Sequence, residues 1–311
     1  MDVTSGPFYA GSDTSAGTGT LTLADGTTLE SYYNTVTLSN PVSLGNNVTL
    51  GSIQSLDSLA PLTLSGTVTV ANASTTMLLN SGASVYLAGT LAGPPSTSLM
   101  IQGNNSGEPI DGGSQIVLQG TLSNVASINV SAAQLILAPS GNPATSFSSL
   151  SASGLQVSNS GYLGLDGTFV TPGAVVAFLS TYGPTLGPNI GGTLGFDTVA
   201  NPSTPNIFSD PINLSNFYSE GFLGLGSATA AILTGPINPS SAGYQFGGGG
   251  GTLTVQSNLP DFDGTELIMS AAPSPVTVLL QGSNTYQGGT RSLGGVLIFD
   301  SPTPTSGERC V

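Results

Sequence analysis

A short phrase that repeats from Thr20 to about Phe169 constrains the fold of this chain more than any other feature. Three to six residues alternate between apolar side chains and Ser or Thr, and a Gly, Asn, Pro or Asp then breaks the run. Examples are LTL at 21–23, VTL at 36–38 and 48–50, and QLILA at 134–138. Alternation with a period of two gives each strand one face for a core and one for water. The phrase therefore predicts many short β-strands.

The spacing of these strands leaves the architecture open between a sandwich or barrel and a solenoid. A solenoid is favoured because the outward positions are Ser, Thr, Asn and Gln, and because hairpin signals such as Asp25-Gly26 and Asp166-Gly167 are few. A parallel β-helix places about three short strands in each coil of roughly 20 to 25 residues. We therefore expect an all-β chain that forms a parallel β-helix, with a β-sandwich as the less favoured alternative.

Three segments differ in pattern. Residues 1–171 and 241–311 carry the alternating phrase and are expected to form coils of the β-helix. Residues 172–240 are rich in proline and are expected to form a loop-rich insertion or cap. Within that segment, AVVAFLSTY at Ala174–Tyr182 follows Pro172-Gly173 and predicts a short helix, because proline suits a first helical turn.

The segment LLQGSNTYQGGTRSLGGVLIF, residues 279–299, resembles the autotransporter-associated β-strand repeat of bacterial surface proteins. The matching positions are Leu280, Gly282, Asn284, Thr285, Tyr286, Gly288, Gly289, Thr290, Gly294, Gly295 and Leu297. Residues 222–255 are similar to the stretch that precedes such repeats. The resemblance implies a right-handed β-helix in the passenger of a secreted or cell-surface protein. Members of the family usually have a signal peptide, whereas MDVTSGPFYAG lacks a basic n-region and an apolar h-region, so we expect a segment of a longer protein.

The residues of this repeat can also be interpreted from backbone chemistry alone. Gly288-Gly289 and Gly294-Gly295 allow positive φ at corners where a coil turns. Asn284 tolerates a left-handed conformation or can stack in an internal ladder. These residues are therefore expected to serve the turns and packing of the coils.

The charge composition excludes several classes of function. The chain has 16 acidic residues, two arginines and no Lys, His or Trp, which gives a formal net charge of −14. Serine or cysteine nucleophiles activated by histidine, Schiff bases, phosphate-binding P-loops and imidazole metal sites are therefore absent from the sequence. No basic groove for nucleic acid can be assembled, and no apolar run reaches the roughly 18 residues that span a membrane. We expect a non-catalytic protein that neither binds nucleic acid nor inserts into a membrane.

Two acidic groups remain as candidate sites. The phrase DFDGTE places Asp261, Asp263 and Glu266 around Gly264, and such oxygen clusters are typical of calcium ligands, although the phrase is only a partial EF-hand loop. Its alternative is a solvated acidic loop. Glu108 and Asp111 in SGEPIDGG could act as a carboxylate pair in glycoside cleavage, with a solvated turn as the alternative.

One further phrase approaches a known calcium motif. GGTLGFD at residues 191–197 is close to the nonapeptide GGxGxD but has one residue too many, and it occurs once where such sites need stacked copies. No cofactor other than calcium is indicated by the sequence.

These observations together predict a cell-surface or secreted β-helix segment that acts as a structural spacer or an adhesin. A carbohydrate-active enzyme and a calcium-stabilised glycan-binding module are the alternatives. Glycans or other surface proteins are the expected partners, and the coil that ends at 296–299 is expected to support self-association. The expected location is extracellular or at the cell surface, associated with the outer membrane in the full-length protein.

Overall fold

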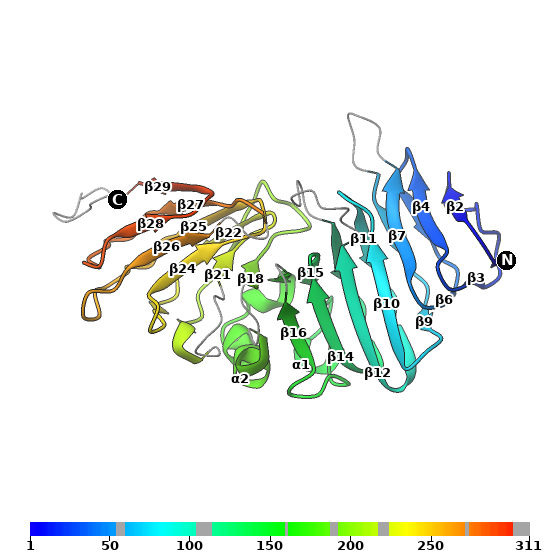
Figure 1. Ribbon diagram of the computed structural model, residues 1–311, viewed down its shortest axis with the longest axis horizontal. Coiled ribbons are helices and arrows are strands. Elements are labelled where there is room, and N and C mark those ends of the chain that lie inside the picture. The colour runs from blue at the N-terminus through cyan, green and yellow to red at the C-terminus, as the bar shows by residue number, and fades with distance from the viewer. Residues whose placement is uncertain are drawn as a thin grey trace. The chain divides into compact units, whose positions relative to one another are not determined.

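The protein is a right-handed parallel β-solenoid in which 8% of the chain is helical. The computed structural model describes residues 1–53, 60–103, 114–158, 161–186, 192–216, 224–270 and 274–300. The chain divides into two compact units, Met1–Gln156 and Val157–Val311. The strands stack in parallel ladders (Figure 1), so the β-helix expected from the sequence is confirmed and the sandwich is not formed.

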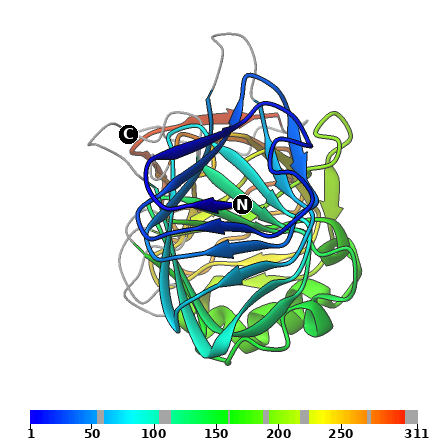
Figure 2. The same ribbon diagram turned by 90° about the vertical axis from the view of Figure 1, so that its right-hand side faces the viewer.

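The N-terminal unit winds its chain in successive coils, which Figure 2 shows from the N-terminal side. One ladder runs through β1 (Asp2–Val3), β3 (Leu21–Leu23), β6 (Val42–Leu44), β9 (Val68–Val70) and β12 (Leu91–Gly103). A second runs through β2 (Pro7–Ala10), β4 (Thr28–Tyr32), β7 (Val48–Ile53) and β10 (Ser74–Leu79), and meets β12, which also pairs with β14 (Leu122–Ser131). The third contains β5 (Val36–Leu38), β8 (Leu62–Leu64), β11 (Ser84–Leu87), β13 (Gln115–Leu118) and β15 (Gln134–Leu137). A single helical turn, α1 (Pro143–Ser146), precedes β16 (Leu155–Ser158), which crosses the boundary between the units.

The core of this unit is built from stacked aliphatic side chains. Leu21, Val42 and Val68 are register partners on successive coils, and each is at most 1% exposed. Burial of one such side chain stabilises the fold by roughly 1.5–3 kcal/mol relative to exposure. Because each coil buries its apolar face only against its neighbours, the alternating phrase of the sequence is the repeating unit of the core.

The C-terminal unit has the same construction. One ladder contains β17 (Tyr162–Leu165), β18 (Thr193–Phe196), β21 (Gly224–Gly226), β24 (Tyr244–Gly247), β26 (Leu267–Ser270) and β28 (Thr290–Ser292). Another contains β19 (Asn206–Phe208), β22 (Ala230–Leu233), β25 (Thr252–Val255), β27 (Thr277–Leu280) and β29 (Val296–Phe299). The short strands β20 (Ile212–Asn213) and β23 (Ile237–Asn238) pair with each other. Two 3₁₀ turns, η1 (Gly167–Val170) and η2 (Leu214–Asn216), and one longer helix, α2 (Ala174–Leu186), complete the unit.

The predicted helix in the proline-rich segment is confirmed as α2, which packs on η1 through the rings of Phe178 and Phe169, 5.2 Å apart. Asp210, far along the chain, accepts hydrogen bonds from the amides of Gly173 (2.7 Å) and Val175 (2.9 Å) at the start of α2. This carboxylate therefore satisfies donors that the first helical turn leaves without partners.

The prediction of a loop-rich insertion over 172–240 needs correction. The segment contains β18 to β23, and β18 and β21 lie within the same parallel ladder as β24. The sequence pattern hid these strands because β18 is buried at every position and β21 reads Gly-Leu-Gly, so neither alternates between apolar and polar residues. The predicted boundaries at 171/172 and 240/241 also differ from the division of the chain after Gln156.

Asp and Asn side chains connect successive coils at their corners. Asp25 Oδ1 accepts a hydrogen bond from the Asn46 amide (2.7 Å), and Asn46 Oδ1 accepts one from the Thr76 amide of the next coil (2.8 Å). Asp261 Oδ1 does the same for the Gln287 amide (2.9 Å). Several acidic residues of this chain thus satisfy backbone donors where strands end and ladder hydrogen bonds stop.

The glycines of the repeat-like segment have two distinct roles. Gly289 and Gly295 have φ of +87° and +79°, as expected for corner residues. Gly288 is needed for a different reason, because a Cβ there would lie 2.2 Å from the Gly264 carbonyl oxygen of the preceding coil. Asn284 is buried and accepts a hydrogen bond from the Leu259 amide (3.3 Å), which places it inside the coil.

Candidate functional site

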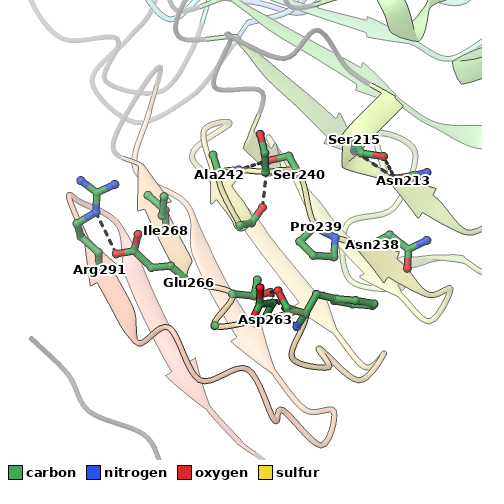
Figure 3. Close-up of a pocket in the computed structure, with 15 residues that line it drawn as sticks. Asn213, Ser215, Asn238, Pro239, Ser240, Ala242, Asp263, Glu266, Ile268 and Arg291 are labelled. Atoms are coloured by element: carbon green, nitrogen blue, oxygen red, sulfur yellow. Dashed lines mark hydrogen bonds and ion pairs between the residues drawn. The ribbon is translucent and has the colours of Figure 1, made fainter.

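A polar groove of about 750 Å³ opens on the surface of the C-terminal unit (Figure 3). Its walls come from successive coils, which supply β20 with η2, the turn at 238–243 after β23, the turn at 261–265 before β26, and β28. Asn213 and Asn238 lie at one end of the groove, and Glu266 with Arg291 at the other. The groove therefore crosses the direction of the strands, and its lining combines amides, hydroxyls, the Asp263 carboxylate and one ion pair with the apolar side chains of Pro239, Ala242, Phe262 and Ile268.

The two asparagines occupy equivalent positions on neighbouring coils. Asn213 and Asn238 are register partners in the pair β20 and β23. Asn213 Oδ1 accepts hydrogen bonds from the Ser215 amide (3.1 Å) and hydroxyl (2.7 Å), which fixes the orientation of this side chain. At the next turn the Ser240 hydroxyl accepts a hydrogen bond from the Ala242 amide (3.1 Å). The groove wall is thus held in place by local side-chain to backbone hydrogen bonds.

The acidic phrase DFDGTE forms a tight turn at the edge of the groove. Asp261 accepts hydrogen bonds from the amides of Gly264 (3.2 Å), Thr265 (3.0 Å) and Gln287 (2.9 Å). These bonds, led by that from Gln287, hold the pKa of Asp261 below its ordinary value. Asp263 has φ of 59° and Gly264 has φ of 79°, so the turn passes through two left-handed residues.

The structure does not gather Asp261, Asp263 and Glu266 into a calcium site. Asp261 faces three backbone donors, and the Glu266 carboxylate pairs with Arg291. Within the described ranges, no group of three or more acidic or cysteine side chains is arranged to hold a metal ion. The same spacing also suits a turn that closes on itself, because an aspartate before a glycine can accept hydrogen bonds from the amides of its own turn.

The ion pair at the end of the groove is solvated. Arg291 Nε lies 3.2 Å from Glu266 Oε1, and the two side chains are 50% and 36% exposed. A pair of this kind contributes only about 0–1 kcal/mol to stability. Its consequence for the groove is chemical, because Glu266 offers acceptors and Arg291 offers donors to a ligand while their charges cancel.

Phe262 gives the groove an apolar element. Its side chain is 52% exposed, so about half of its surface is accessible to a ligand in the groove. Amides, hydroxyls, a balanced ion pair and one exposed aromatic ring together suit a neutral ligand that has both hydroxyl groups and an apolar face.

A second cluster of polar groups is fully enclosed in the same unit. Asp197 is 0% exposed and accepts hydrogen bonds from the Tyr162 hydroxyl (2.7 Å), the Ala228 amide (2.8 Å) and the Thr229 hydroxyl (3.0 Å). Burial raises the pKa of Asp197 to about 6, although these hydrogen bonds act in the opposite direction. Asp166 lies nearby, and burial also raises its pKa.

This enclosed cluster explains the phrase GGTLGFD. Asp197 is its last residue and lies inside the fold, where it orients the start of the next coil through Ala228 and Thr229. A Cβ on Gly195 would lie 1.8 Å from the Tyr162 hydroxyl oxygen, so the glycine makes room for that ring. The phrase therefore reflects internal packing, and Asp197 does not face a surface groove.

Two sequence candidates lie outside the described residues. These are Glu108 and Asp111, the pair considered for glycoside cleavage. Sequence reasoning, for its part, did not single out Phe262, Asn213, Asn238 or the groove that they share. The paired Ile-Asn dipeptides at 212–213 and 237–238 were the available signal, because they recur one coil apart.

Comparison with protein-family models, curated protein sequences and solved structures finds no match for this chain. Among the described residues, no helix has the length and apolar character that crossing a membrane requires.

Proposed function

We propose that the chain is a non-catalytic segment of a secreted or cell-surface β-helix protein of the autotransporter type, and that it acts as an adhesin whose groove binds neutral glycans. The groove at 213–291 carries this proposal. The proposed location is extracellular, in association with the outer membrane. The spacer role is compatible with the same fold, but it gives no reason for an exposed Phe262 beside fixed hydrogen-bonding groups.

The charge of the groove favours a neutral ligand over an acidic one. Among the described residues that line it, the ionisable ones are Asp263, Glu266 and Arg291, and the last two compensate each other. The remaining carboxylate and a net charge of −14 for the chain would repel a polyanion. A neutral oligosaccharide avoids this repulsion and presents both hydroxyl groups and apolar C–H faces.

The arrangement of the groove favours an extended ligand. Equivalent asparagines on neighbouring coils are spaced by the distance between stacked strands, about 4.8 Å. A sugar chain can therefore contact corresponding groups on consecutive coils, and the Phe262 ring can stack on one of its rings.

Binding to an array of neutral and acidic oligosaccharides tests the proposal. We expect retention of neutral glycans by the wild-type chain and a loss of about fivefold in affinity for Phe262→Ala, since covering the exposed half of the ring contributes roughly 1 kcal/mol. Ile207→Ala is the matched control, because Ile207 is similarly exposed (54%) but lies outside the groove. Equal binding by both variants, or retention of acidic glycans alone, would contradict the groove assignment.

Two assays separate the alternatives. Release of reducing ends from neutral or acidic polysaccharides would favour the enzyme, above all if it disappears in Glu108→Gln or Asp111→Asn. Glycan binding that requires added calcium would favour the calcium-stabilised module. We expect neither turnover nor a calcium requirement.

A further inference from the structure

Three tyrosines form an exposed cluster on the N-terminal unit, which we name the tyrosine patch. Tyr9 lies on β2, Tyr32 is the last residue of β4, and Tyr33 follows it. Their side chains are 46%, 45% and 47% exposed. The ring centroids of Tyr9 and Tyr32 are 6.0 Å apart, and those of Tyr32 and Tyr33 are 4.4 Å apart in an edge-on arrangement. The strands β2, β4 and β7 that carry this region are neighbours (Figure 1).

The backbone of the patch is unfavourable for a tyrosine. Tyr33 has φ of 56°, in the left-handed region where glycine or asparagine is usual and a bulky side chain is rare. Among the residues that the structure describes, glycines occupy most of the positive-φ positions. A residue that keeps a large ring in such a conformation points to a role for the ring itself.

The N-terminal unit that carries the patch has an acidic composition. Tyr9 is the register partner of Glu30, whose side chain crosses Gly51 to bond Asn80 and is 6% exposed. Burial raises the pKa of this carboxyl group. Residues 1–156 contain seven acidic residues and no Lys, Arg or His. The unit therefore has a negative potential that no basic side chain of its own can compensate.

We propose that the tyrosine patch binds organic ammonium cations, in particular quaternary ammonium groups. Aromatic rings attract cations through the negative potential of their faces, and ring clusters are the usual protein sites for methylated ammonium groups. Such a cation has apolar methyl groups that fit the exposed rings and a charge that suits an acidic unit. This proposal is independent of the groove on the C-terminal unit.

The test compares a cation with its neutral isostere. The full chain is titrated with choline, with tetramethylammonium and with dimethylbutanol, the uncharged carbon analogue of choline, by calorimetry or by NMR of the tyrosine rings. We expect choline to bind at least about tenfold more tightly than dimethylbutanol, because charge adds to the contact of the methyl groups.

The variants identify the site without damage to the fold. Tyr33→Gly removes a ring and relaxes the positive φ, so it is expected to fold well and to lose choline binding by about tenfold. Asn47→Gly is the matched control, because Asn47 has φ of 57° but contributes no ring. Tyr9→Phe keeps the ring and should keep the binding.

Two sources of the same group are distinguished by direct binding. Retention on phosphatidylcholine vesicles supports a lipid headgroup as the natural ligand, and retention of a trimethyllysine peptide supports a modified protein. Equal affinity for choline and dimethylbutanol would overturn the proposal, as would binding of methyl glycosides in place of choline. Full choline binding in Tyr33→Gly, or no saturable binding of any cation by the wild type, would overturn it as well.

Discussion

The buried carboxyl group of Asp197 makes the stability of this protein depend on pH in an unusual direction. Its pKa is about 6 in the folded chain against an ordinary value of 3.8, because no solvent reaches it. This difference corresponds to about 3 kcal/mol of destabilisation once the group is ionised. Below the pKa of the unfolded chain, about 3.8, the group is neutral in both folded and unfolded chains and carries no energetic penalty. Above the pKa of the folded chain, about 6, the group is ionised in both states and the full penalty is present.

The stability contribution of Asp197 should therefore fall as pH rises from about 4 to about 6. Over the middle of this range the folded chain binds nearly one more proton than the unfolded chain, which gives a slope of about 1.4 kcal/mol per pH unit. The raised pKa values of Glu30 and Asp166 act in the same direction, whereas the lowered pKa of Asp261 acts in the opposite one. Most proteins whose carboxylates are stabilised by the fold show the opposite trend.

Urea unfolding followed by circular dichroism between pH 4 and 7.5 measures this slope. Asp197→Asn removes the titrating group, so its free energy of unfolding should change less with pH than that of the wild type. Asp2→Asn, on the exposed surface, should retain the wild-type slope. The reasoning is refuted if Asp197→Asn shows the full wild-type slope, or if the wild-type stability rises more steeply from pH 4 to 6 than that of Asp197→Asn.

Three further perturbations test separate parts of the account. Gly195→Ala should destabilise the chain by about 3 kcal/mol or more, because its Cβ would lie 1.8 Å from the Tyr162 hydroxyl oxygen. Gly11→Ala is the control and should have little effect, since a Cβ there has no atom within 4 Å. Equal urea midpoints for the two variants would contradict this prediction. Asp210→Ala should cost about 1–2 kcal/mol and increase hydrogen exchange in α2, and unchanged exchange there would show that Asp210 is not its cap. Millimolar calcium should leave the thermal midpoint unchanged, since Asp261 already accepts three backbone hydrogen bonds. A stabilisation above about 2 kcal/mol would instead support a calcium site at Asp261, Asp263 and Glu266.

The fold could be predicted from the sequence because its core repeats. Strands such as β3 and β6 alternate between buried leucine or valine and solvated Ser or Thr, and that alternation is visible without coordinates. Strands such as β18 and β21 escaped prediction because both of their faces are covered and glycines replace side chains. The pattern rule fails where a strand has no solvated face.

The candidate sites were less predictable, because their chemistry depends on contacts between coils. The phrase DFDGTE indicated a metal site from spacing alone, whereas the amide of Gln287, on the next coil, occupies its first carboxylate. The groove combines residues from 213 to 291, and the tyrosine patch combines Tyr9 with Tyr32 and Tyr33. No local motif marks such sets, since the register of the coils brings them together.

Hydrogen exchange of the whole chain, with and without a retained neutral oligosaccharide, tests the central claim most directly. The account predicts that protection is confined to the groove segments at 213–215, 238–243, 262–268 and 291, with the oligosaccharide recovered intact. Protection centred on the segment that carries Glu108 and Asp111, or recovery of a cleaved sugar, would contradict a non-catalytic adhesin that binds through this groove.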